Sequence, residues 1–289
     1  MVKLRVSASS ANLGPGFDCL SAALSLSANF SFEQKDEGLI ITGCPPGMES
    51  SDNLIYQSYL KGMQTFGLTP RGLSIHVDSD IPAARGLGSS AACIIAGLKA
   101  AAIFHNVQLS DDELLLLACA MEGHPDNAAA AFYGGARMSV WEEDRVISRP
   151  IPVHDSLRFL ALIPDFSLST HQARSVLKDM VPLKDAVFNL SRTALLVKAL
   201  EQGDMDLLLF SCQDRLHQPL RYPLIRDSRA LVDKMNSLGA ACCISGAGPT
   251  LLCIYLGDDF EKEAASFCKS YPSWQAKALH LDLQGLQIQ

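Results

Sequence analysis

The stretch that most constrains this chain is PAARGLGSSAA at residues 82–92, which directly precedes a long run of small apolar residues. Glycine loses more conformational freedom on folding than any other residue, so two glycines within three positions indicate that a backbone segment must approach another group closely. The two serines that follow are typical of the start of a helix. We therefore predict a helix from about Ser89 to His105 that is entered through a glycine turn.

Three interpretations of the glycine turn are open: a helix cap, a dinucleotide loop and a phosphate cradle. Residues 86–91 fit the G-x-G-x-x-[GA] fingerprint, but that fingerprint needs a second strand ending in an acidic residue about 20 positions later. The acids at 111 and 112 instead open a helix, and no lysine precedes the serines as a Walker loop requires. Capping by a serine does not explain both glycines. Backbone N–H groups at a helix start can bind a polyphosphate, and a serine hydroxyl there can reach Mg²⁺.

Composition narrows the class of protein further. The 289 residues are 48% apolar and 19% charged, which is enough to bury a substantial core in one large or two medium domains. The formal net charge of −7 argues against a nucleic-acid-binding protein, which would carry a basic surface. The apolar run LLLLACAM at 114–121 is far too short to span a membrane. Nine scattered cysteines without a C-x-x-C pair favour reduced thiols in a cytoplasmic protein over a disulfide framework or a zinc site.

Polarity patterns predict an α+β fold, with its best candidate boundary in the proline-rich crossing near 150–156. Ser110 followed by Glu113 fits a capping box, and GHPDN at 123–127 is interpreted as a break after that helix. Strands are expected at 2–8, 20–33, 38–43, 72–82, 157–165, on both sides of a glycine turn within 241–255, and at the C-terminus, with a hairpin over 136–153. Helices are expected at 54–66, 89–105, 110–121, 170–179, 184–202, 204–216, 226–237 and 259–270.

Four stretches together carry a resemblance to a known family. PAARGLGSSAA resembles the central motif of the GHMP kinases, which phosphorylate small molecules. SSANLGPGFDCL at 9–20 and ISGAGPTLLCI at 244–254 agree with that family in order and spacing, and EGHPDNAAAAFYGG occupies 122–135. The stretches at 9–20 and 122–135 are similar to their counterparts in homoserine kinases in particular, and the four motifs span nearly the whole chain.

The resemblance implies a two-domain GHMP kinase fold with a left-handed βαβ crossover in the N-terminal domain. Residues 1–155 would form the ATP-binding domain, and residues 156–289 would complete the substrate site. The implied reaction is ATP-dependent phosphorylation of L-homoserine to O-phospho-L-homoserine, a step of threonine biosynthesis. A GHMP kinase for another small alcohol, a non-catalytic ligand sensor with this fold, and a dinucleotide-dependent oxidoreductase are the alternatives. No nucleic-acid or membrane partner is expected, and a homodimer stays open.

The resemblance also nominates residues for ATP and Mg²⁺. The triphosphate would lie against the glycine turn at the start of the helix, with Asn53 beside the adenine. The nucleotide-binding set is Asn53, Pro82, Ala83, Ala84, Arg85, Gly86, Leu87, Gly88, Ser89, Ser90, Ala91 and Ala92. Ser90 and Glu122 are the expected ligands of Mg²⁺, a hard cation that prefers oxygen donors.

Homoserine presents one carboxylate, one ammonium and one hydroxyl. Its carboxylate calls for the planar fork of arginine, and Arg174 and Arg221 fit the family pattern. The remaining substrate contacts implied by the resemblance are Asn12, Asp18, Asp126, His124 and Thr170. Asp126 and Asn127 are the expected catalytic residues, with Asn127 orienting the hydroxyl. Asp126 could act as a base or only hold the substrate, because phosphoryl transfer through a loose transition state does not require a strong base.

Overall fold

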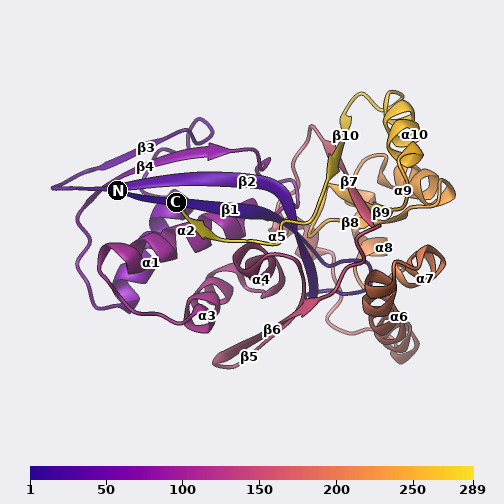
Figure 1. Ribbon diagram of the computed structural model, residues 1–289, viewed down its shortest axis with the longest axis horizontal. Coiled ribbons are helices and arrows are strands. Elements are labelled where there is room, and N and C mark those ends of the chain that lie inside the picture. Colours follow the sequence, from indigo (N-terminus) through magenta and orange to yellow (C-terminus); the bar gives the residue numbers. More distant parts are fainter.

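Two β-sheets, one in each lobe, organise the computed structural model, which describes residues 1–289 (Figure 1). The first sheet has seven strands in the order β11-β1-β2-β4-β3, and β5 pairs with both β2 and β6. Its strands are β1 (Val2–Ala11), β2 (Leu20–Lys35), β3 (Leu39–Thr42), β4 (Gly72–Ser79), β5 (Ala136–Glu142), β6 (Arg145–Ile151) and β11 (Gln287–Ile288). The second sheet has the order β10-β7-β9-β8, with β7 (Arg158–Pro164), β8 (Ala241–Ile244), β9 (Leu251–Tyr255) and β10 (Trp274–Leu279).

Four helices of the first lobe cover one side of its sheet in Figure 1. They are α1 (Leu54–Thr65), α2 (Ser89–Phe104), α3 (Asp111–Glu122) and α4 (Asp126–Tyr133). β3 and β4 form the only parallel pair of strands, and α1 joins them as a strand–helix–strand unit. α1 and α2 touch through their backbones, because a Cβ atom at Gly97 would overlap with the carbonyl oxygen of Ile55. The small residues of α2 therefore permit this close packing of the two helices.

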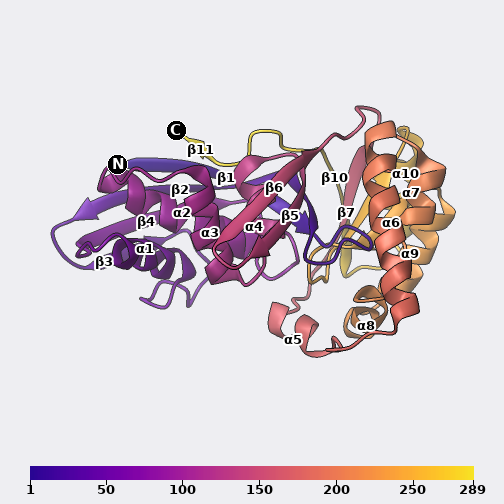
Figure 2. The same ribbon diagram turned by 90° about the horizontal axis from the view of Figure 1, so that it is seen from below.

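The second lobe carries the remaining helices. They are α5 (Thr170–Ser175), α6 (Leu183–Gln202), α7 (Met205–Ser211), α8 (Gln218–Arg221), the 3₁₀-helix η1 (Tyr222–Leu224), α9 (Ser228–Ser237) and α10 (Asp259–Cys268). Figure 2 shows α5 and α8 close together at the lower edge of this lobe. The expected α+β class and mixed order of strands and helices are confirmed.

Two short helices, α4 and α8, were not predicted from the sequence, and two of the predicted helices are shorter in the structure than expected. The break at 123–127 is only three residues long: Gly123, in the left-handed region at φ 89°, ends α3, and α4 starts directly after Pro125. The alanines of this stretch then propagate the helix, since alanine has the highest helix propensity. The helix expected over 170–179 ends at Ser175, and the one expected over 204–216 ends at Ser211. The capping box of Ser110 and Glu113 is confirmed.

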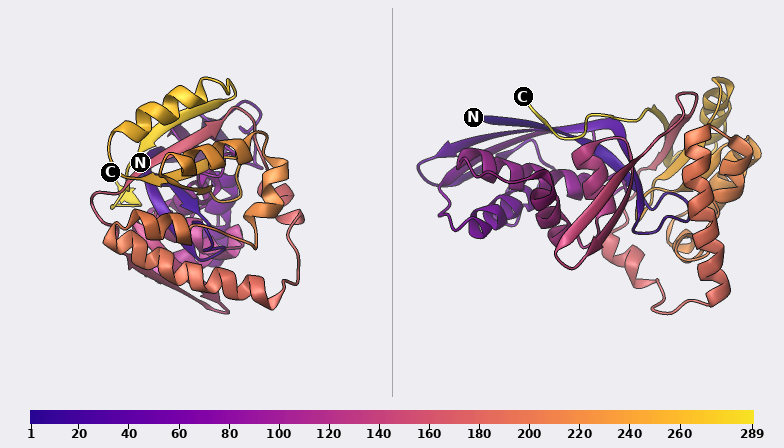
Figure 3. Two further views of the ribbon diagram at one scale, coloured as in Figure 1. Left: turned by 90° about the vertical axis from the view of Figure 1, so that its right-hand side faces the viewer. Right: turned by 60° about the horizontal axis from the view of Figure 1, so that its bottom comes forward.

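The two lobes exchange segments of chain. After β10 the chain returns to the first lobe, where β11 pairs with β1 and brings the two termini close together (Figures 1 and 3). In the opposite direction, the loop after β1 reaches the second lobe, where the backbone at Gly14 touches Cys212. No helix combines the length and the apolar character needed to cross a membrane. All nine cysteines are free, as their spacing predicted.

Candidate active site

A cavity of about 840 Å³ lies between the lobes and is lined from both of them. The glycine turn and α2 form one side, and α5 and Arg221 form part of the other. The nominated residues that line it are Asn12, Asn53, Ala83, Ala84, Arg85, Gly86, Gly88, Ser89, Ser90, Glu122, His124, Asn127, Thr170, Arg174 and Arg221. The nominated residues that do not line it are Asp18, Pro82, Leu87, Ala91, Ala92 and Asp126. Residues far apart in the sequence are thus brought to one cavity.

The glycine turn packs against its own chain. Gly86 and Gly88 have φ angles of 75° and 73°, in the left-handed region that favours glycine. A Cβ atom at Gly88 would overlap with the hydroxyl of Ser9 in β1, and one at Gly86 would overlap with the carbonyl oxygen of Ser245. The close approach predicted from the two glycines is therefore that of the glycine turn to β1 and to the turn after β8.

α2 begins without a side-chain cap. Gly88 is its N-cap residue, no side chain accepts from the first turn, and the first main-chain bond runs from Ala92 N to the Gly88 carbonyl. The interpretation of Ser89 or Ser90 as a helix cap is therefore wrong. The N–H groups that precede this first bond have no partner within the helix, and with the helix dipole they favour an anion at this end.

Ser90 and Glu122 are in contact at the N-terminal end of α2. The Ser90 hydroxyl donates to Glu122 Oε2 over 2.8 Å, although 32 positions separate the two residues. Burial raises the pKa of Glu122, and the charge of His124 opposes that shift. No group of three or more histidines, cysteines and acids is arranged to hold a metal ion. One carboxylate and one hydroxyl are nevertheless the donor set that Mg²⁺ uses when phosphates and waters supply its other ligands.

A second polar group lies at the start of α4. His124 Nδ1 is 2.6 Å from Asp126 Oδ1, which also accepts the backbone N–H of Asn127 over 2.7 Å. Burial works against a charged imidazole, but the hydrogen bond and charge of Asp126 prevail and raise the pKa of His124. Asp126 is fully buried, and its second oxygen, Oδ2, has no hydrogen-bond partner. The Ser9 hydroxyl donates to Asn127 Oδ1 over 2.9 Å, which fixes that amide at the cavity wall.

Arg174 and Asp18 are paired with each other across the two lobes. Arg174 donates from Nη2 to Asp18 Oδ1 over 2.7 Å and from Nη1 to Oδ2 over 3.2 Å. Both side chains keep about a third of their surface exposed, so water screens the pair. Asn12 accepts the backbone N–H of Asp18 and donates to the carbonyl of Gly246, which joins the loop after β1 to the turn after β8.

Arg221 is the most buried cation of the cavity, with only 1% of its surface exposed. Its Nε donates to the carbonyl of Ala173, and its Nη1 donates to the carbonyl of Gly246 and to His217 Nδ1. No carboxylate pairs with it, and its Nη2 makes no hydrogen bond within the protein. Burial lowers the pKa of Arg221 to about 10, so the guanidinium stays charged at neutral pH.

Two nominated residues already bond to protein groups, and these contacts qualify their expected roles. The Arg85 guanidinium donates to the carbonyls of Ala83, Pro164 and Asp165, so it ties the glycine turn to the end of β7. Asn53 caps α1, because its Oδ1 accepts the N–H of Ile55.

Thr170, which was also nominated, is the first residue of α5. It lines the cavity and makes no side-chain hydrogen bond.

Sequence reasoning missed several residues that hold the others in place. Ser9 fixes Asn127, His217 contacts Arg221, and the carbonyl of Gly246 accepts from both Asn12 and Arg221. His217 stands four positions before Arg221, and a helical spacing of four was a signal that could have found it. The turn after β8, at residues 245–249, also contacts the stretch at 9–20, since the Gly246 N–H donates to the Ala11 carbonyl.

Family sequence models match both lobes. The model of the GHMP kinases N terminal domain matches residues 53–135, and that of the GHMP kinases C terminal domain matches residues 196–273. A homoserine kinase of Clostridium botulinum is 43% identical over 294 residues, which covers 100% of this chain and 98% of that protein. A homoserine kinase of Clostridium beijerinckii is 39% identical, with 100% and 96% covered.

Solved structures agree with the sequence relatives. The crystal structure of a homoserine kinase from Cytophaga hutchinsonii has a TM-score of 0.84 at 26% identity and covers 100% of this chain and 97% of that one. A putative homoserine kinase from Listeria monocytogenes has a TM-score of 0.81 at 26% identity, with 100% and 99% covered. A mevalonate kinase from L. major, at 16% identity and a TM-score of 0.72, shows the same fold over 96% of this chain and 94% of that one.

Proposed function

The chain belongs to the GHMP kinase family, and on that basis we propose that it transfers the γ-phosphoryl group of ATP to the side-chain hydroxyl of L-homoserine. The product is O-phospho-L-homoserine, an intermediate of threonine biosynthesis. Two lines of support meet here: the full-length similarity to homoserine kinases, and a cavity that offers separate places for a polyphosphate and for an amino acid.

The observation that carries the substrate assignment is the environment of Arg221. Burying a guanidinium without a carboxylate partner costs free energy unless an anion binds to it. The Nη2 group of Arg221, which has no partner within the protein, is available to donate to such an anion. A planar carboxylate fits this fork. Arg174 lies on the same cavity and can share the carboxylate, and Asn12 Oδ1 can accept from the ammonium group. Asp18 lies outside this lining and would act through its pair with Arg174.

The nucleotide belongs on the opposite side. The polyphosphate would lie at the start of α2, where N–H groups and the helix dipole favour negative charge. Ser90 and Glu122 would hold Mg²⁺, which supplies charge neutralisation on the phosphate oxygens when it is bound. Arg85 would act chiefly through its hold on the end of β7, since its Nε, Nη1 and Nη2 atoms each already donate to a carbonyl.

In the reaction the substrate hydroxyl oxygen forms a bond to the γ-phosphorus, the bond from that phosphorus to the bridging β–γ oxygen breaks and ADP leaves, and the hydroxyl proton is released to water. Such transfer depends chiefly on positioning and charge neutralisation. We assign Asn127 to orienting the hydroxyl, because Ser9 holds its amide at the cavity wall. Asp126 lies behind this wall and holds His124 and the start of α4, which favours positioning over proton removal.

A coupled assay for ADP release tests the proposal with L-homoserine, mevalonate and shikimate as acceptors. We expect turnover with L-homoserine alone, because only this acceptor presents both a carboxylate and an ammonium to the charged side of the cavity. The exposed substitution Glu142→Gln serves as a control for handling and folding. A preference for an acceptor that is not an amino acid would refute the substrate assignment and leave the family assignment intact.

A further inference from the structure

Arg221 cannot aim at a substrate unaided, because an arginine side chain has many rotamers and this one projects from a helix of only four residues. Three contacts restrict it. The Ala173 and Gly246 carbonyls accept over 3.1 Å each, and His217 Nδ1 lies 3.2 Å from Nη1. Of these three partners only His217 contributes a side chain, so it is the one that a substitution can remove.

The protonation of His217 follows from its neighbours. Arginine has donors only, so Nδ1 must accept and cannot carry a proton. Nε2 therefore carries the proton and donates to the Gly14 carbonyl over 2.9 Å. Burial and the charge of Arg221 lower the pKa of His217, and Asp214, the Gly14 carbonyl and Asp18 act in the opposite direction. The ring is fully buried and tilts against Phe17, which leaves it little freedom to turn.

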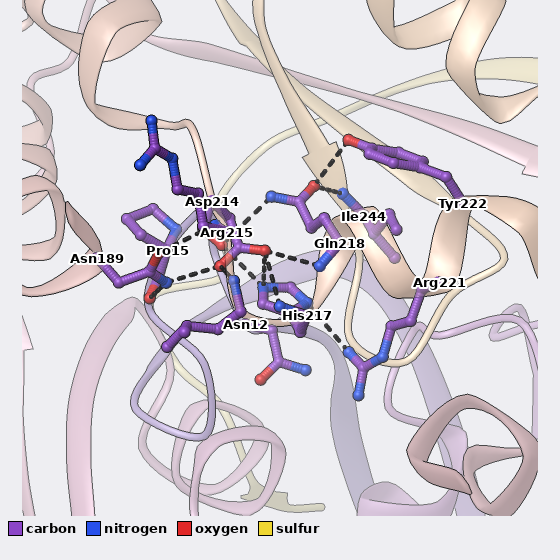
Figure 4. Close-up of polar contacts among 12 residues, drawn as sticks. Asn12, Pro15, Asn189, Asp214, Arg215, His217, Gln218, Arg221, Tyr222 and Ile244 are labelled. Carbon is purple, nitrogen blue, oxygen red and sulfur yellow. Dashed lines mark hydrogen bonds and ion pairs between the residues drawn. The ribbon is translucent and has the colours of Figure 1, made fainter. Parts of the chain in front are cut away.

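Asp214 anchors the segment that carries this histidine (Figure 4). Its Oδ2 accepts the backbone N–H groups of His217 and Gln218 over 3.0 and 2.7 Å. Its Oδ1 accepts the Asn189 amide over 2.6 Å, which ties the start of α8 to α6. In Figure 4 the contacts run from Asp214 through His217 to the Arg221 guanidinium.

We propose that His217, as the neutral Nε2–H tautomer, is a positioning residue that aims Arg221 at the substrate carboxylate. The role rests on the proposed function, because it presumes that Arg221 binds the carboxylate of L-homoserine. The imidazole supplies the acceptor for Nη1, so that the unpaired Nη2 is held toward the cavity. Asp214 and the Gly14 carbonyl fix the ring that does this.

Two substitutions separate positioning from mere packing. His217→Gln reaches as far as Nε2, so it keeps a donor for the Gly14 carbonyl but removes the acceptor for Arg221. His217→Asn reaches only as far as Nδ1, so it keeps an acceptor for Arg221 and removes the donor to Gly14. We expect His217→Gln to raise the KM for L-homoserine about tenfold, the effect of one lost hydrogen bond to a charged group. We expect His217→Asn to stay within about twofold of wild type, and kcat and the KM for ATP to change little in both variants.

A double-mutant cycle and a spectroscopic measurement complete the test. In an Arg221→Ala background, His217→Gln should leave the KM for L-homoserine unchanged, because the residue that it positions is gone. The ¹⁵N chemical shifts of the His217 ring, identified by comparison with His217→Gln, should report a protonated Nε2 and an unprotonated Nδ1.

Three results would overturn the role of His217. One is a wild-type KM in His217→Gln. Another is an equal rise of KM in the Gln and Asn variants together with an equal loss of thermal stability. The third is a protonated Nδ1. If instead wild-type protein fails to phosphorylate L-homoserine, the proposed function fails first, and the ¹⁵N shifts still decide whether the Arg221–His217 contact exists.

Discussion

On the α2 side of the cavity, main-chain groups and short side chains from neighbouring positions face the open space, whereas on the side of α5 and α8 long charged side chains from distant segments meet. The glycine turn, Ser89 and Ser90 follow one another in the chain. Arg174 and Arg221 are 47 positions apart, and the Asp18 that pairs with Arg174 is a further 156 positions away.

The two sides also differ in how their charges are balanced. At the nucleotide side a hydroxyl and a carboxylate await a cation, and burial disfavours the charged carboxylate. On the substrate side the buried Arg221 has no anionic partner, whereas Arg174 is paired with Asp18 and screened by water. Each side of the cavity therefore lacks the charge that its own ligand would bring. Substitutions on one side should leave the binding of the other side's ligand unchanged.

Glu122→Gln should have the largest effect. Loss of the only carboxylate beside Ser90 removes an expected ligand of Mg²⁺, whose charge neutralisation is worth several kcal/mol, so kcat should fall about a thousandfold. Steady-state kinetics at saturating Mg²⁺ should show this while binding of L-homoserine, followed by calorimetry, changes little. Glu142→Gln, on an exposed hairpin, is the matched control. A kcat within tenfold of wild type would mean that Glu122 is not a metal ligand.

Arg221→Ala should raise the KM for L-homoserine about a hundredfold and leave the KM for ATP unchanged. A buried charged hydrogen bond to a carboxylate is worth about 3 kcal/mol, which corresponds to this factor. Arg229→Ala, at an exposed ion pair of α9, is the control for loss of an arginine. A comparable rise in both KM values would show that the two sides are coupled, and thermal unfolding would reveal whether the cause is loss of structure.

The same contrast explains what could be predicted from the sequence. The strands, the long helices and the glycine turn are local features, set by polarity patterns, caps and backbone freedom, and these predictions were largely right. The short helix α8 was missed because Asp214, rather than a periodic apolar face, holds its first N–H groups. α4 was missed because three residues between helices resembled a loop.

For the cavity, the resemblance supplied the residues but not their contacts. No pattern in the sequence shows that Arg85 turns toward the carbonyls of β7, or that Arg174 is already paired with Asp18. Such contacts depend on where the second sheet lies relative to the first. Ser9, which holds Asn127, depends on the same tertiary packing, and the spacing of four that pairs His217 with Arg221 becomes a signal only once helix α8 is known.

Arg174→Ala should raise the KM for L-homoserine by about tenfold, clearly less than Arg221→Ala. Its guanidinium is about a third exposed and shared with Asp18, so water and the aspartate weaken what a ligand gains from it. Measuring the two variants side by side in the same assay tests whether burial ranks the two arginines. An effect of Arg174→Ala equal to that of Arg221→Ala would contradict this ranking.

The smallest expected effect, a few-fold, is a difference in the pH dependence of the two ligands. Burial raises the pKa of Glu122, so as pH falls toward 5 this carboxyl takes up a proton before an exposed glutamate would, and a protonated carboxyl binds Mg²⁺ poorly. Arg221, with a pKa of about 10, keeps its charge throughout this range. The KM for MgATP should therefore rise between pH 7 and pH 5 while the KM for L-homoserine stays nearly constant, and Glu122→Gln should lose the pH dependence. A KM for L-homoserine that rose in parallel would mean that a titrating group on the substrate side, and not Glu122, governs the acid limb.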